Sequence, residues 1–289
     1  MKALFSIQNW FLENVGNIDL ATIKNWFLFN PKQPLLFNSA IFLGFFLVFY
    51  VIYILSRKTH TFRITYVVLF SLFFYYKSSG IYFGLLIFSS VVDYVLSRLI
   101  YEEAKQGYRK FYMILSLLIN LGMLAYFKYT DFLLDNFNGI FGSDVPLPHI
   151  VLPLGISFFT FTQIAFLVDA YKGEAREYNL THYMLFVTYF PHLLAGPILH
   201  HKEMMPQFAS RWNWAVRWRN VAVGLFLFSI GLFKKVVIAD TFAQWADAGF
   251  DTATTLNFFE AWATSLSYTL QLYFDFSGYT DMAIGMSLM

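Results

Sequence analysis

The chain has 289 residues, of which 58% are hydrophobic, 21% are aromatic and 13% are charged. Soluble domains carry roughly a quarter charged residues, so this composition is typical of a membrane protein. The net charge of +2, with basic residues spread along the chain, gives no indication of nucleic-acid binding. The absence of cysteine excludes disulfides, thiolate zinc sites and cysteine nucleophiles.

The first 38 residues mix aromatic and polar side chains and end near Pro31 and Pro34, which is typical of an interfacial segment lying on the membrane. From residue 39 onward, apolar stretches approach the length of about 20 residues that crosses a bilayer. The expected spans are 39–55, 63–77, 80–100, 111–134, 150–171, 220–239 and 259–289. The sequence therefore predicts an all-α, polytopic transmembrane domain over 39–289, preceded by an interfacial segment over 1–38.

Basic residues predict which connections face the cytoplasm. They flank the connections near residues 57–63, 98–110 and 172–176, whereas 135–149 contains two aspartates and no basic residue. This alternation places the N-terminus outside. Lys234 and Lys235 then lie near the outer end of their span, where they can snorkel to the surface.

The apolar stretch 182–199 does not fit a simple crossing, because basic connections flank it on both sides. Pro191, Gly196 and Pro197 break a helix here, and broken backbone at membrane depth is tolerated only where protein or a water-filled cavity surrounds it. We therefore expect 182–199 to be a re-entrant segment.

The last span carries polar side chains that a membrane should exclude. Asp275, Ser277, Tyr279 and Asp281 lie within QLYFDFSGYTDMAIG at 271–285. At 100° per residue, Asp275 and Tyr279 share one helix face, and Ser277 and Asp281 share another. A charge at the bilayer centre costs about 2.5 to 3.5 kcal/mol on insertion scales, so these groups indicate a functional cavity, or else pairing with a basic residue on a neighbouring helix. We expect Asp275 to be the more sensitive of the two acids.

Other polar residues give weaker signals. His192 is a candidate general base in irregular backbone, and equally a packed residue that satisfies a freed carbonyl. Gln163 is a candidate tunnel residue among small and hydroxylated residues that otherwise serve helix packing. His200, His201 and Glu203 resemble metal ligands, but neighbouring histidines point apart on a helix and the HExxH spacing is absent, so no metal site is predicted.

Three stretches in order resemble one family: LPLGISFFTFTQIAFLVDAYKG at 152–173, FPHLLAGPILHHKEMMPQF at 190–208 and YTLQLYFDFSGYTDMAIG at 268–285. Together they are similar to the membrane-bound O-acyltransferases, in the bacterial branch that includes the alginate O-acetyltransferase and the teichoic-acid D-alanyl transfer protein. The resemblance implies a multi-pass protein of the cytoplasmic membrane with a tunnel between its helices. The candidates for that tunnel are Gln163, His192, Asp275, Ser277, Tyr279 and Asp281.

The resemblance also implies a reaction. An acyl group, acetyl in the simplest case, passes from a cytoplasmic donor such as acetyl-CoA or an acyl-carrier thioester to hydroxyl groups of an extracytoplasmic polysaccharide or envelope polymer. Membrane lipids and an extracytoplasmic protein are the implied partners, and no bound cofactor is implied. In the family the catalytic histidine follows the FDFSGY helix, and no histidine follows His201 here. The expectation is thus an N-terminal portion, inactive by itself, whose catalytic histidine lies beyond Met289.

Two other functions stay open at this point. A transporter or channel also uses re-entrant segments and intramembrane acids, although no inverted repeat is evident in the sequence. An inactive membrane scaffold that binds partner proteins is the third interpretation.

Overall fold

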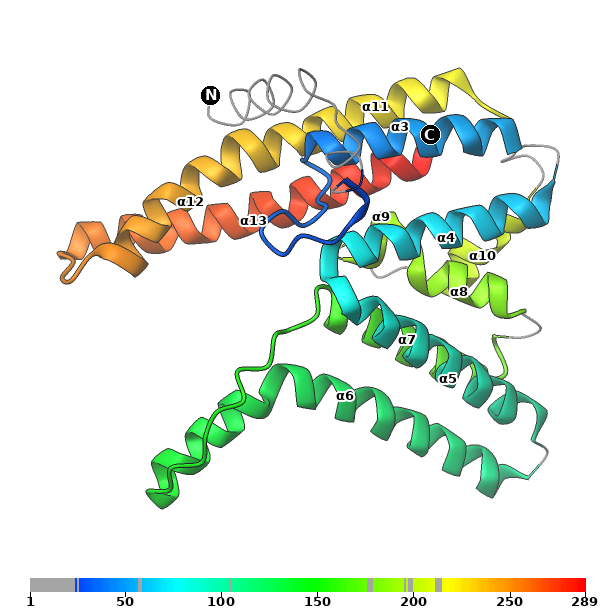
Figure 1. Ribbon diagram of the computed structural model, residues 1–289, viewed down its shortest axis with the longest axis horizontal. Helices are drawn as coiled ribbons and strands as arrows, with labels where there is room; N and C mark the ends of the chain where they lie inside the picture. The colour runs from blue at the N-terminus through cyan, green and yellow to red at the C-terminus, as the bar shows by residue number, and fades with distance from the viewer. Residues whose placement is uncertain are drawn as a thin grey trace. The chain divides into compact units, whose positions relative to one another are not determined.

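The computed structural model describes residues 24, 26–56, 59–103, 105–175, 179–194, 196, 200–210 and 215–289. Across these ranges every regular element is a helix and none is a strand, which confirms the predicted all-α class. The chain forms two compact units. The terminal unit comprises Met1–Lys58, Ala195–Pro197 and Trp212–Met289, and the central unit comprises Thr59–Leu194 and Ile198–Arg211 (Figure 1). Most of the expected interfacial segment 1–38 lies outside the described residues.

The terminal unit is built on two long helices that run side by side (Figure 1). One is the continuous helix Trp218–Thr252, and the other is α13 (Phe258–Leu288). The first divides into α11 (Trp218–Phe233), the π-helical turn η4 (Lys234–Ala239), α12 (Asp240–Asp247) and a second π-helical turn, η5 (Ala248–Thr252). A further helix, α3 (Ala40–Leu55), precedes them in the chain.

Glycines set the spacing of this helix pair. A Cβ atom placed on Gly231 would lie 2.5 Å from the carbonyl oxygen of Gly278, and one placed on Gly224 would lie 2.5 Å from that of Gly285. The two backbones therefore touch at two levels, in antiparallel order. Small residues permit this close approach between helices in a membrane, where no hydrophobic effect drives association.

Local hydrogen bonds explain where the terminal-unit helices begin. Asn257 and Glu260 form a capping box at the start of α13, with Glu260 N donating to Asn257 Oδ1 at 3.0 Å and Asn257 N donating to Glu260 Oε2 at 2.8 Å. The Ser39 hydroxyl accepts from the Phe42 N–H at the start of α3. Both caps satisfy backbone N–H groups that have no partner inside their helices.

The central unit contains α4 (His60–Ser79), the short 3₁₀ turn η2 (Gly80–Tyr82), α5 (Phe83–Glu102), α6 (Gln106–Phe141) and α7 (Ile156–Lys172). It continues with α8 (Leu180–Thr188), α9 (Phe190–Leu193) and α10 (His201–Ala209). Helices α5, α6 and α7 pack on one another around Leu96, Ile100 and Leu167, and α8 packs on α4. Gly173, at φ 77°, ends α7 in the left-handed region that glycine adopts without strain.

Three stretches of the described chain are long and apolar enough to cross a membrane: His60–Glu102, Gln106–Phe141 and Trp218–Thr252. They contain the expected spans 63–77, 80–100, 111–134 and 220–239. The expected span 39–55 coincides with α3, a shorter apolar helix. The stretches 150–171 and 259–289 are helical over α7 and α13, and their passage through the membrane stays a prediction. Four of the basic topology residues, Arg57, Lys58, Arg176 and Arg211, lie outside the described residues.

The expected break in 182–199 is present. Helix α8 ends at Thr188, and α9 begins after Tyr189 with Pro191 in its first turn. Proline has no N–H to continue the ladder of helical hydrogen bonds, so the break follows from the sequence. The membrane depth of this segment stays a prediction.

Candidate functional site

The acids of α13 are held by the two consecutive lysines of η4. Lys234 Nζ lies 2.6 Å from Asp281 Oδ2 and donates to Ser277 Oγ at 3.0 Å. Lys235 Nζ lies 2.6 Å from Asp275 Oδ1 and 3.1 Å from Asp240 Oδ1. The sequence predicted that both lysines can snorkel, and it left open that the acids pair with a basic residue on a neighbouring helix. The structure shows the pairing, and we call these four contacts the α13 ion-pair cluster.

The cluster includes the first two residues of the π-helical turn. Consecutive helical residues point about 100° apart, and the long side chains of both lysines nevertheless reach acids of α13. In this structure Lys234 opens η4, and a π-helical turn is a rare insertion that often marks a functional segment. The close glycine contact at Gly231 and Gly278, one turn away, keeps the backbones near enough for both ammonium groups to reach α13.

The structure brings together only part of the predicted α13 group. Ser277 and Asp281 share Lys234, as their common helix face predicts. Asp275 and Tyr279 have different neighbours: Asp275 pairs with Lys235, and the Tyr279 ring stacks on Phe37 with 4.6 Å between ring centroids. A joint role of Asp275 and Tyr279 in orienting a substrate therefore gains no support from their contacts.

The two ion pairs differ in exposure, and this difference sets what each can do. The side chains of Lys234 and Asp281 are 27% and 24% exposed, whereas Asp275 is 49% exposed. A partly buried pair with matched hydrogen bonds fixes helix geometry, and removing one partner leaves a charge without compensation. Asp275 is the more exposed of the two acids, so loss of its lysine should cost less.

Gln163 lies fully buried between α7 and α5. Its Nε2 donates to Ser89 Oγ at 3.2 Å and to Ser90 Oγ at 3.0 Å, and both hydroxyls donate in turn to the carbonyl of Leu86. Its Oε1 accepts no hydrogen bond from any described residue. These contacts join two helices as packing does, and the role of Gln163 in a tunnel stays a prediction.

A neighbouring pair of buried polar residues was missed by the sequence analysis. Asp93 on α5 is 1% exposed and accepts from Asn120 Nδ2 on α6, with 2.8 Å to Oδ1 and 2.9 Å to Oδ2. Asn120 also donates to the Ser116 carbonyl. The available signal was a lone acid inside an apolar span, which is itself an indication of function or of a specific partner.

His192 satisfies a carbonyl that the helix break sets free. In a continuous helix the Phe186 carbonyl would accept from the Phe190 N–H, but that N–H donates to Ser71 Oγ at 3.1 Å. The His192 Nε2 lies 3.1 Å from the Phe186 oxygen, and since a carbonyl only accepts, Nε2 carries the proton. His192 is buried, and its Nδ1 has no hydrogen-bond partner among the described residues. The contact agrees with the packing interpretation of His192.

The predicted residues fall into two sets. Gln163 and His192 belong to the central unit, and Asp275, Ser277, Tyr279 and Asp281 belong to the terminal unit. The central unit also contains a group of described residues able to hold a metal ion, Asp169, His200 and His201, which the sequence analysis set aside. Glu203, which the sequence pattern grouped with the two histidines, is not part of this group.

Comparison with known proteins adds a family and several relatives. The model of the MBOAT (membrane-bound O-acyltransferase) family matches residues 101–289. The chain is 47% identical to the peptidoglycan O-acetyltransferase of Helicobacter pylori over 283 residues, covering 88% of this chain and 54% of that protein. It is 44% identical over 183 residues to the probable alginate O-acetylase AlgI of Pseudomonas aeruginosa, covering 62% of this chain and 34% of that protein.

A more distant relative is the teichoic acid D-alanyltransferase of Bacillus subtilis, at 26% identity over 148 residues, which cover 49% of this chain and 38% of that protein. The chain thus spans about half the length of the first of these relatives and about a third of the other two.

Proposed function

Because this chain belongs to the membrane-bound O-acyltransferase family, we propose that the protein transfers an acetyl group to hydroxyl groups of a cell-envelope polysaccharide. Peptidoglycan is the first candidate acceptor. The observation that carries this proposal is the 47% identity to the Helicobacter pylori peptidoglycan O-acetyltransferase across 88% of the chain. An alginate-like polymer is the second candidate acceptor, on the 44% identity to AlgI over a shorter range.

The chemistry proposed is acyl transfer from a thioester. A base takes the proton of the acceptor hydroxyl, and the hydroxyl oxygen attacks the carbonyl carbon. The C–S bond then breaks, and the base returns the proton to the departing sulfur, which leaves as the thiol. The donor is a cytoplasmic thioester such as acetyl-CoA or an acyl-carrier thioester. The resemblance assigns the base to a histidine that follows a helix of the α13 type, so no histidine of residues 1–289 is assigned to this role.

The residues of this chain are proposed to shape the acyl path. Lys234, Ser277 and Asp281 brace α13 against η4, because they are the less exposed part of the α13 ion-pair cluster. Asp275 with Lys235 is the pair open to a ligand. Gln163 and His192 are held by hydrogen bonds within the protein, which supports packing roles for both.

The setting is proposed as follows. The protein is multi-pass in the cytoplasmic membrane, with residues 1–38 as an interfacial segment and 39–289 as part of the transmembrane domain. The acceptor lies outside the cytoplasm, and an extracytoplasmic protein assists its acetylation. Cysteine labelling of single introduced cysteines from outside intact cells tests this topology. Labelling at a residue near 215 from outside would contradict the expected cytoplasmic side of the connection before α11.

The function is tested in cells. We expect deletion of the whole gene to lower the acetate released from purified peptidoglycan by mild base, and the intact gene to restore it. The same measurement on other envelope polysaccharides identifies the acceptor. If acetate falls only in another polymer, the peptidoglycan assignment is wrong. If no polymer loses acetate, the proposed reaction is wrong.

Variants of the cluster test its part in the reaction. Asp275→Asn keeps the shape of the side chain and removes its charge, and Asp251→Asn is the matched control at an exposed position with no ion pair among the described residues. We expect Asp275→Asn to reach normal membrane levels and to lower polymer acetate, while Asp251→Asn leaves both unchanged. Normal acetate with Asp275→Asn would leave this acid only a structural role.

A further inference from the structure

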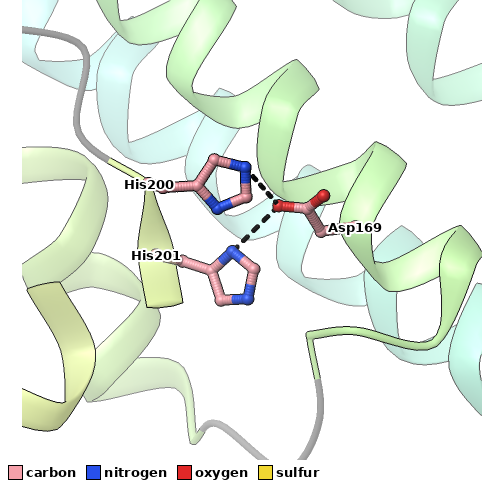
Figure 2. A group of neighbouring side chains, drawn as sticks. All are labelled: Asp169, His200 and His201. Atoms are coloured by element: carbon pink, nitrogen blue, oxygen red, sulfur yellow. Dashed lines mark ion pairs between the residues drawn. The ribbon is translucent and has the colours of Figure 1, made fainter. Parts of the chain in front are cut away.

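A cluster of two histidines and an aspartate lies at the end of α7 and the start of α10, within the central unit. Asp169 Oδ2 is 3.0 Å from His201 Nδ1 and 3.4 Å from His200 Nε2, and the three ligand atoms lie within 4.8 Å of one another. Figure 2 shows both rings turned toward the same carboxylate oxygen.

Backbone geometry explains why both rings converge. The sequence analysis placed the two histidines on a helix, where neighbours point apart. His200 instead precedes α10 as its N-cap, with extended backbone at φ −79° and ψ 138°, and only His201 lies in the helix. The change of backbone conformation between them lets consecutive side chains face one point.

One carboxylate oxygen of the cluster has no hydrogen bond of good geometry from the described residues. The Asp169 side chain is 7% exposed, yet no described residue donates to its Oδ2 in hydrogen-bond geometry, although two ring nitrogens are near. Asp169 also lies in the last turn of α7, where the negative end of the helix dipole disfavours a carboxylate. A buried charge in this position needs a cation.

The histidine beside it lies in an apolar environment. His201 is 1% exposed and packs edge-on against the rings of Phe166 and Phe186. This burial lowers the pKa of the imidazole, although the Asp169 carboxylate acts in the opposite direction. Neutral imidazole is the form that binds metal ions.

The lysine next to the cluster is already paired. Lys202 forms an ion pair with Glu174, which raises the pKa of the lysine and lowers that of the glutamate.

We propose that Asp169, His200 and His201 form a binding site for a divalent transition metal of the zinc class. Two imidazoles and one carboxylate suit zinc better than calcium or magnesium, which prefer oxygen ligands. Ligand atoms around a tetrahedral zinc lie roughly 3.3 to 3.6 Å apart, close to the observed 3.0 and 3.4 Å. His200 is half exposed, so a water molecule can take the fourth position.

The metal would connect the end of α7 to the start of α10. We assign the metal a structural role, because its ligands join two helices of the central unit. This role does not depend on the acyl-transfer proposal. Zinc that binds only the folded protein stabilises it by mass action. The expected signs are therefore bound metal and a higher melting temperature, both measurable without any assay of activity.

The test uses the whole protein, purified in detergent, stripped with a chelator, loaded with zinc chloride and desalted. We expect about one zinc per chain by elemental analysis, the stoichiometry of a single tetrahedral site. Asp169→Asn, His200→Ala and His201→Ala should each weaken zinc binding by more than the roughly 10- to 100-fold that loss of an outer partner costs. Glu203→Gln, at an exposed acid on α10 outside the group, is the matched control and should bind zinc normally.

Two further readouts protect the test against misfolding. His200→Ala changes a half-exposed side chain and should fold even if the buried variants do not. Cobalt chloride in place of zinc should give the visible absorption of a tetrahedral site in the wild type and lose it in His200→Ala. Zinc retained equally by all variants, no zinc in the wild type, or an equal loss in Glu203→Gln would overturn the proposal and leave a packed Asp–His contact.

Discussion

The backbone contact between α11 and α13 makes a quantitative prediction for Gly231→Ala. The added Cβ would lie 2.5 Å from the Gly278 carbonyl oxygen and 2.7 Å from the Met282 nitrogen. Both neighbours are backbone atoms and cannot rotate away. The contact to oxygen is about 0.9 Å shorter than the 3.4 Å at which ordinary contact begins, so the helices must separate by about that distance.

This separation reaches the α13 ion-pair cluster. A shift of about 0.9 Å would lengthen the 2.6 Å contact between Lys234 Nζ and Asp281 Oδ2 to about 3.5 Å, beyond a good hydrogen bond. Overpacking of this kind costs about 1 to 3 kcal/mol. Alanine recovers about 1 kcal/mol over glycine through helix propensity. We therefore expect a net destabilisation of about 1 kcal/mol.

Gly122→Ala on α6 is the matched control, because no described atom lies within 4 Å of its added Cβ. This variant gains helix propensity alone and should be more stable by about 1 kcal/mol. The two variants should thus differ by about 2 kcal/mol in unfolding experiments in detergent, or by several degrees in melting temperature. Equal stability of Gly231→Ala and Gly122→Ala would show that the glycine contact does not limit the helix spacing.

Three further sets of contacts are tested by variants in the same unfolding experiment. Lys234→Met should cost roughly 1 to 3 kcal/mol by leaving Asp281 uncompensated, and adding Asp281→Leu should recover most of it; no recovery would contradict the pairing. Asp281→Asn should destabilise more than Asp275→Asn, because Asp275 is more exposed, and the reverse order would contradict this. His192→Ala should cost about 1 to 3 kcal/mol by freeing the buried Phe186 carbonyl, and an unchanged midpoint would contradict that contact.

The sequence predicted the helices well and the partners of their polar residues poorly. Hydropathy and length predict where helices lie, because every backbone group in a bilayer must be satisfied within the helix itself. Pro191 predicts the break after α8, because proline has no N–H to continue the helical hydrogen bonds. The contact between Asp93 and Asn120 joins residues 27 positions apart on different helices, and periodicity along one chain segment contains no information about which faces meet.

Two doublets of basic residues show where the sequence pattern was insufficient. Lys234 and Lys235 were expected to be able to snorkel near the outer end of their span, and His200 and His201 were set aside as joint ligands because neighbours on a helix point apart. In the structure a π-helical turn opens at Lys234, and an extended residue stands at His200. Lys234 and Lys235 pair with Asp281 and Asp275 of α13. The rings of His200 and His201 both face Asp169 of α7.

Both irregularities place two neighbouring basic side chains beside carboxylates. The lysines form ion pairs with Asp281 and Asp275, and both histidine rings face Asp169. In this chain a Lys-Lys and a His-His doublet each coincide with an irregular backbone. Where such a doublet has acids on a neighbouring helix, regular helix geometry is the wrong starting assumption for locating a site.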